Sequence, residues 1–243
     1  MKLLNGATLR TLQFGSIVLA TSVLVACGGS GDSPGATVSG TAAVGVAMAN
    51  ASIVLTCKNG TGSATANASG AYSATFKFDG PCAITATGGA ITIHSFAAGA
   101  GTYNVTPLTE LLLSYLAGQL GTTVSGLLSG ISSNATFQSA LSNSTVIANA
   151  EAAVAQLIKT RYGITLSSSS FLTVSFTPGQ PGADADLDAL LTAGAITANG
   201  QPAASLTAAA TAAGAAAPIS GGGNSGGATG GTGGTGGTGT TTK

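Results

Sequence analysis

Charged and aromatic side chains are scarce in this sequence. Lys, Arg, Asp and Glu make up only 6% of the 243 residues, against roughly 25% in typical soluble proteins. Trp is absent, aromatic residues amount to 5%, and there is a single histidine. Nucleic-acid binding lacks electrostatic support because it requires a basic stripe. The few aromatic rings also argue against a carbohydrate-binding platform of stacked rings.

Several motifs that would indicate membrane spans or bound groups are missing as well. The chain has no run of about 18 to 20 apolar residues, which a membrane-spanning helix requires. It contains neither a Gly-x4-Gly-Lys-Ser/Thr phosphate loop nor a Cys-x2-Cys metal pair. We therefore expect no bound cofactor and no metal.

The beginning of the chain has the layout of a secretory signal. Lys2 and Arg10 supply positive charge, and residues 14–26 are mostly apolar, as in a signal peptide. This stretch ends in Leu-Val-Ala-Cys at residues 24–27. The pattern resembles the lipobox of bacterial lipoproteins, in which the cysteine receives diacylglycerol. The resemblance implies a signal peptide over residues 1–26, with lipid on Cys27; the alternative is an ordinary secretory signal with a chance cysteine.

The residues after this cysteine suit an anchored protein. Residues 27–35 are rich in Gly and Ser, which is typical of a flexible tether, and two or more acyl chains hold a protein firmly to a membrane. In Gram-negative lipoproteins, Asp after the cysteine commonly causes retention at the inner membrane. Gly28 therefore suggests the outer membrane, without indicating which face. Removal of Lys2 and Arg10 leaves five basic and seven acidic residues, a net charge of −2.

Residues 36–105 show the alternation of short β-strands separated by turn residues. One face of each expected strand carries the apolar side chains, and Asn-Gly, Ser-Gly and Asp-Gly pairs mark turns. Several short strands at this spacing predict a β-sandwich. The apolar positions that share a face in the later strands are Tyr72, Ala74, Phe76 and Phe78, then Cys82, Ile84 and Ala86, then Ile91 and Ile93.

Three segments of this region resemble a known sandwich. They are Val38-Ser39-Gly40, the aliphatic run within residues 49–55, and the polar turn before Tyr72 within residues 65–72. Together they are similar to the carboxypeptidase-regulatory-like, or transthyretin-like, domain, a relative of immunoglobulin-like sandwiches. Collagen-adhesin B-type and starch-binding-like sandwiches share much of this pattern. The resemblance implies a fold and no activity.

Cys57 and Cys82 are the cysteines that remain once Cys27 is lipidated. Both fall on the apolar face of their expected strands. A cysteine pair in an exported protein usually forms a disulfide, which we predict here. The alternatives are two buried free thiols or a metal site, and the latter lacks partners because His94 is the only histidine.

Residues 106–217 have helical periodicity and are rich in alanine. Thr106-Pro107 is typical of a helix start, and residues 104–110 are similar to a junction in exported bacterial proteins that carry such a sandwich. A second helix is expected from Ser144 to Tyr162, closed by Gly163. Other helical segments are expected around Leu127 and Phe137 and over residues 184–191 and 206–216, with a strand or extended segment at 171–176 and a disordered Gly/Thr-rich tail at 218–243.

Two patterns that suggest chemistry are rejected. Gly-Asn-Ser-Gly-Gly at residues 223–227 matches a serine-hydrolase nucleophile motif, but Ser225 falls in the tail, away from the strand-to-helix turn that the mechanism needs. Asp184, Asp186 and Asp188 imitate the start of a calcium loop, yet its required glycine and glutamate are missing. These acids fit a helix N-terminus better, so we expect a non-enzyme.

The sequence thus predicts an α+β protein, with an N-terminal immunoglobulin/transthyretin-like β-sandwich followed by an alanine-rich helical region. The expected function is a non-catalytic cell-envelope lipoprotein, a structural or binding module of unknown protein or glycan partner. The alternative is an accessory glycan- or peptide-binding protein of the cell surface. Such a protein would use loops near Tyr72, His94 or Tyr103.

Overall fold

The structure is a computed structural model that describes residues 35–219. Cys27, the signal peptide, most of the tether and the Ser225 motif therefore lie outside the described residues. Strands occupy residues 36–102 and helices residues 107–215. The predicted α+β class is confirmed.

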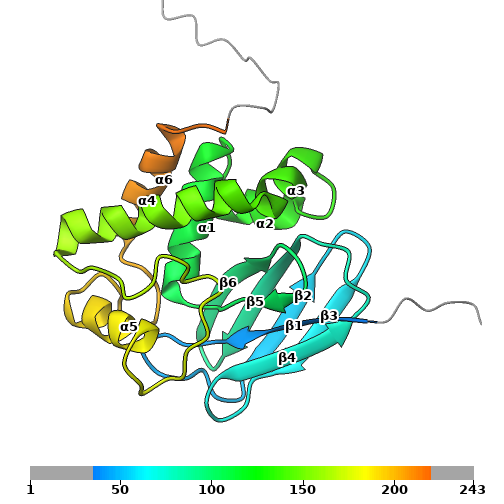
Figure 1. The fold of residues 1–243 in the computed structure, drawn as a ribbon, viewed down its shortest axis with the longest axis horizontal. Helices are drawn as coiled ribbons and strands as arrows, with labels where there is room; N and C mark the ends of the chain where they lie inside the picture. The colour runs from blue at the N-terminus through cyan, green and yellow to red at the C-terminus, as the bar shows by residue number, and fades with distance from the viewer. Residues whose placement is uncertain (1–34, 220–243) are drawn as a thin grey trace, which may run out of the picture. The chain divides into compact units, whose positions relative to one another are not determined.

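The described strands form two sheets (Figure 1). The three-stranded sheet has the order β4-β1-β7, and the four-stranded sheet has the order β3-β2-β5-β6. All neighbouring strands are antiparallel except β1 and β7. The strands are β1 (Ala36–Thr41), β2 (Ser52–Thr56), β3 (Thr61–Thr65), β4 (Ala71–Phe76), β5 (Cys82–Gly88), β6 (Ile91–Ala97) and β7 (Gly101–Thr102).

The two sheets face each other across a shared apolar cluster, which we call the inner core. Alternation along each strand sends every second side chain toward this cluster. Val38 and Tyr72 reach it from one sheet, and Ile53, Ile84 and Ile93 from the other. These side chains are 4% exposed or less, so the predicted faces are confirmed for them. Strand β4 ends at Phe76, so Phe78 lies beyond the strand to which the sequence assigned it.

Helix α1 (Pro107–Gln119) packs on the opposite face of the four-stranded sheet at β6, as Figure 1 shows. Ala83 and Phe96 project from this face into a second cluster made with the helices, which we call the outer core. Every residue from Pro107 to Gly118 is buried. The five leucines of α1 therefore form only part of its contact surface, because α1 lies between the sheet and other helices.

The remaining described helices follow the sequence expectations closely. They are α2 (Val124–Gly130), α3 (Ala135–Ser142), α4 (Ser144–Tyr162), α5 (Ala183–Thr192) and α6 (Ala204–Ala215). Helix α4 begins after Asn143, whose side chain accepts hydrogen bonds from two backbone N–H groups, and ends at Gly163 with φ of 71°. In the described part of the chain, no single helix is long and apolar enough to cross a membrane; α1 and α2 meet that criterion only jointly and are bent by 85°.

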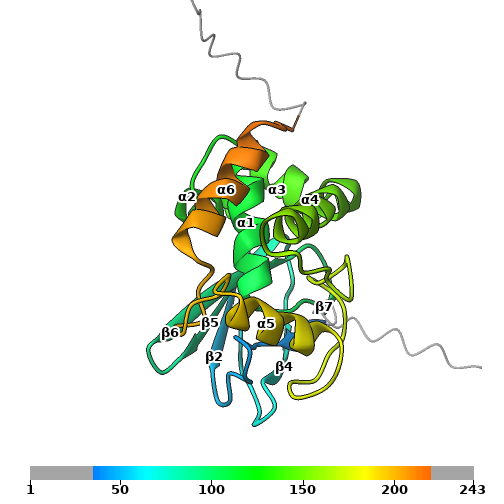
Figure 2. The same ribbon diagram turned by 90° about the vertical axis from the view of Figure 1, so that its left-hand side faces the viewer.

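Helices α1 and α6 pack side by side at two glycines (Figure 2). A Cβ atom added to Gly118 would lie 2.1 Å from the carbonyl oxygen of Thr211, and one added to Gly214 would lie 2.0 Å from that of Tyr115. Such distances are far below van der Waals contact. The small residues of α6 therefore allow its backbone to approach α1 directly.

The segment Phe171–Phe176 is not a strand, although its sequence permits one. Its backbone groups are paired instead with buried polar side chains. The Asn104 side chain donates to the carbonyl oxygens of Phe171 and Val174, and Glu151 accepts from the N–H of Leu172. Side chains far away in the sequence thus replace the neighbouring strand.

Candidate functional site

A groove of about 640 Å³ lies on the outer side of the four-stranded sheet. Strands β2, β5 and β6 form its floor, and α1, α2 and Gln201 form its walls. Five of the eleven lining residues carry hydroxyl groups, and one imidazole, one carboxyl, one amide and three apolar side chains complete the lining. The lining side chains that matter below are Thr85, Thr92, His94, Glu110, Ser125 and Ser129.

His94 and Glu110 form the centre of this groove. Nδ1 of His94 lies 2.7 Å from Oε1 of Glu110, and the same oxygen accepts the backbone N–H of His94 at 2.6 Å. The His94 side chain is 30% exposed and that of Glu110 is 11% exposed. The carboxylate holds the Nδ1 side of the ring, so the Nε2 nitrogen is the one that remains for other hydrogen bonds.

The contact of Glu110 with His94 also helps to cover the β6 edge of the four-stranded sheet. Strand β6 is the edge strand, and its outward backbone groups lack a neighbouring strand. Thr109 Oγ1 lies 2.9 Å from the His94 carbonyl oxygen, and Gln201 Nε2 donates to the Thr92 carbonyl oxygen at 2.7 Å. Together with Glu110, which accepts the His94 N–H, these side chains pair the outward backbone groups of Thr92 and His94. They hold the groove floor in place.

The groove is equipped to hydrogen-bond a polar ligand. Hydroxyls donate and accept, and His94 adds a further polar group. A carboxylate-oriented imidazole is also two thirds of a nucleophilic triad. However, no hydrogen bond within residues 35–219 connects the Ser125 or Ser129 hydroxyl to His94, and Ser129 instead donates to the Gly126 carbonyl.

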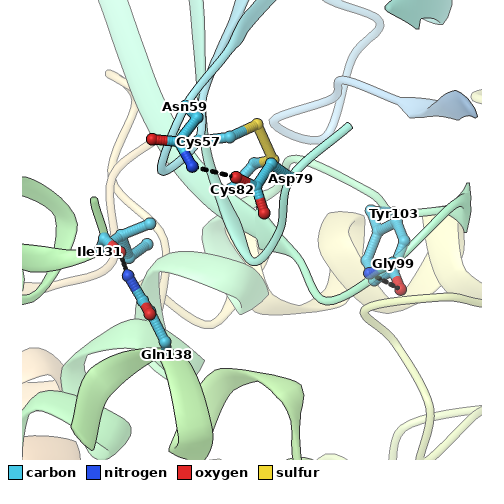
Figure 3. Close-up of a disulfide and its surroundings, with 8 residues drawn as sticks. All are labelled: Cys57, Asn59, Asp79, Cys82, Gly99, Tyr103, Ile131 and Gln138. Atoms are coloured by element: carbon cyan, nitrogen blue, oxygen red, sulfur yellow. Dashed lines mark hydrogen bonds between the residues drawn. A yellow bond between two sulfur atoms is a disulfide. The ribbon is translucent and has the colours of Figure 1, made fainter. Parts of the chain in front are cut away.

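Of the three binding residues suggested by the sequence, only His94 lies in the groove. Tyr72 is 4% exposed, and its hydroxyl donates to the Tyr103 carbonyl oxygen at 2.6 Å. Burial raises the pKa of the Tyr72 phenol. The Tyr103 hydroxyl accepts the Gly99 N–H at 3.0 Å (Figure 3). Tyr72 therefore joins β4 to the residue after β7, and Tyr103 bonds back to the loop between β6 and β7.

The predicted disulfide between Cys57 and Cys82 is confirmed (Figure 3). The two Cα atoms lie 4.1 Å apart, and both residues are at most 3% exposed. The bond links the end of β2 to the start of β5, which are neighbours in the four-stranded sheet. Beside it, the Asn59 side chain donates to the Asp79 carboxylate.

The three aspartates of α5 separate rather than converge. Asp184 accepts the Gly179 N–H at 2.6 Å, and Asp186 accepts both the N–H and the hydroxyl of Ser167. Asp188 is exposed. Among residues 35–219, no three His, Cys, Asp or Glu side chains are grouped so as to hold a metal ion. The aspartates begin the helix and tie down the chain before it.

Sequence reasoning missed two acidic residues. Nothing in the sequence connects Glu110 with His94, because the two residues meet only in the folded chain. Glu151 could have been found from the sequence, because it lies on the apolar stripe of α4, between Ile147 and Val154. Burial raises the pKa of Glu151 to about 7, and the N–H of Leu172 acts in the opposite direction. Its carboxyl lines a separate, smaller cavity.

Comparison with known proteins adds no assignment. No protein-family model matches the chain, and no curated protein and no solved structure matches it either. The groove and the smaller cavity therefore have to be interpreted from their own residues.

Proposed function

We propose that the protein is a non-catalytic lipoprotein of the bacterial cell envelope, anchored by lipid on Cys27. The observation that carries the proposal is the Leu-Val-Ala-Cys motif at residues 24–27, directly after an apolar signal-like stretch. The Cys57–Cys82 disulfide supports it, because disulfides persist in oxidising compartments outside the cytoplasm. Gly28 favours the outer membrane as the destination.

The fold proposed for the strand region is an immunoglobulin/transthyretin-like sandwich, as in carboxypeptidase-regulatory-like domains. Two facing sheets of three and four strands support this assignment. An alanine-rich helical region packed on one sheet completes the module. A fold of this kind presents a binding surface and implies no chemistry by itself.

Metabolic labelling with palmitate tests the anchor. We expect the wild-type chain to incorporate label and to fractionate with the outer membrane, whereas Cys27→Ser abolishes both. Gly28→Asp is the matched variant: it keeps the lipid and shifts the protein toward the inner membrane. Incorporation of label into Cys27→Ser would refute the lipoprotein assignment.

A second candidate function is the binding of a glycan or an extended peptide in the groove. The groove volume of about 640 Å³ lies within the range of sites for small ligands, and its hydroxyl-rich lining suits a polar ligand. Ser129 is exposed on its wall, so Ser129→Trp fills the groove without disturbing the core.

Glycan and peptide arrays test this second function. A specific ligand should bind the wild type, fail to bind Ser129→Trp, and bind normally to Ser139→Trp, where an exposed serine of α3 serves as the control. Array binding that survives Ser129→Trp would exclude the groove, and silence on both arrays would leave the structural role as the function.

A further inference from the structure

A smaller cavity, which shares no lining residue with the groove, lies beside α4. Its volume is about 230 Å³, and it is bordered by α4, by Tyr103 and by the segment after Ser170. Ile147 gives it an apolar wall, while Ser144 and Thr173 add hydroxyls. This volume is below the usual range for drug-sized ligands, so the cavity suits a molecule of a few non-hydrogen atoms.

Glu151 is the acidic residue that lines this cavity. The residue is 5% exposed, and its Oε1 accepts the Leu172 N–H at 2.8 Å. From the part of the chain that the structure describes, no hydrogen bond reaches its second oxygen, Oε2. The carboxyl therefore has an unused acceptor at the cavity wall.

The charge of this carboxyl is not neutralised by the cavity. No Lys, Arg or His is among the described residues that line it. A buried carboxylate without a cationic partner is unfavourable, and burial accordingly raises the pKa of Glu151 to about 7. A cation that entered the cavity would stabilise the ionised form. The positive charge that pairs with Glu151 therefore has to come from a ligand rather than from the protein.

We propose that this cavity binds a small primary amine, whose ammonium group pairs with Glu151. The Tyr103 ring can stabilise the same positive charge through its π face, and the hydroxyls of Ser144 and Thr173 can accept the remaining N–H groups. The alkyl part of the amine would then lie against Ile147. This site is separate from the groove and does not depend on the anchor.

Propylamine and 1-propanol form a matched pair of probes, since they share size and differ in charge. A ligand of about four non-hydrogen atoms binds in the millimolar range at best, so the measurement is an NMR titration of the full chain at pH 8. We expect propylamine to shift the signals of Ile147, Leu172 and Thr173 with saturation. We expect 1-propanol to cause no saturable shift there.

Glu151→Gln is the decisive variant, because the glutamine oxygen can still accept the Leu172 N–H while the charge is removed. It should weaken propylamine binding by about tenfold or more, which corresponds to roughly 1.4 kcal/mol. Asp188→Asn, at an exposed carboxyl of α5, is the matched control and should leave binding unchanged. Equal binding of propylamine to Glu151→Gln and wild type would overturn the proposal.

A second variant keeps the test independent of the stability of Glu151→Gln. Ser144 is exposed at the rim of the cavity, so Ser144→Trp should block entry and leave the fold intact. We expect this variant to lose the propylamine shifts. Retention of the shifts, or equal shifts from 1-propanol in the wild type, would show that the cavity is not an amine site.

Discussion

The two cores on either side of the four-stranded sheet are built from different side chains. The inner core combines six alanines with branched strand residues such as Ile53, Ile84 and Ile93, whereas leucines, five of them from α1, are the commonest residues of the outer core, which also contains Phe96. Strand β6 serves both, because Ile93 points inward and Phe96 points outward. The comparison indicates that this sheet is a central layer, so damage to one core should propagate to the other.

Phe96→Ala should give the largest loss of stability. Phe96 is fully buried, and its truncation leaves a cavity in the outer core, which typically costs about 3 to 5 kcal/mol. Urea unfolding, followed by far-UV circular dichroism, measures the loss. The control is Val54→Ala on the same face of the sheet, where the side chain is 42% exposed and we expect a change within about 1 kcal/mol.

The same experiment tests whether the cores are coupled. If the central sheet joins them, Phe96→Ala should unfold strands and helices in a single transition, with equal midpoints by fluorescence and circular dichroism. Two separated transitions, with the sheets surviving the helices, would show that the cores are independent.

Loss of the disulfide should be the next largest effect. The bond closes a loop with a sequence separation of 25 residues, for which the chain-entropy model gives about 3 to 4 kcal/mol. We expect reduction, or the double variant Cys57→Ala/Cys82→Ala, to lower the melting temperature of the whole described unit. Calorimetry shows whether the whole unit melts at a lower temperature or the strands melt separately. Separate melting of the strands would show that the disulfide stabilises the inner core alone.

The pH dependence of stability should reveal the buried carboxyl on the helical side. The pKa of Glu151 rises from 4.5 to about 7 in the folded protein, so the folded state binds more protons than the unfolded state between these values. The contribution is complete below pH 4.5 and is lost as pH rises through 7. Relative to Glu151→Gln, the wild type should lose up to about 3 kcal/mol over this window; parallel pH profiles would contradict the assignment.

Gly214→Ala should have the smallest effect of the four, and the changed residue lies at the contact of α6 with α1. The added methyl group would meet the Tyr115 carbonyl oxygen, and overpacking of this kind costs about 1 to 3 kcal/mol. Ala212→Leu, at an exposed position of the same helix, is the control for helix propensity and should change stability little. Chemical denaturation of both variants makes the comparison.

Local signals in the sequence were sufficient for most of the elements. Thr106-Pro107 and Gly163 mark helix ends through backbone requirements that act within a few residues. The Cys57–Cys82 pairing followed from strand parity and from the small number of cysteines. Each of these inferences depends on neighbours in the chain, which a sequence displays directly.

The sites could not be predicted because they depend on contacts between distant segments. His94 meets Glu110 only because α1 folds back over the edge of the sheet. Helix α1 is buried all round because α6, about a hundred residues later, packs on its far side. Where both faces of a strand are covered, buried and exposed residues no longer alternate along the sequence. In β5, the consecutive residues 82–84 are all buried.

The covered edge of β6 has a consequence for the order of folding. Three side chains close this edge, and all of them follow the strands in the chain. They are Thr109, Glu110 and Gln201. During synthesis from the N-terminus, the sheet therefore carries an open edge until α1 arrives, and open edges promote aggregation. A fragment that stops at residue 105 would keep that edge open permanently. The helices therefore protect the sheet from aggregation by covering this edge.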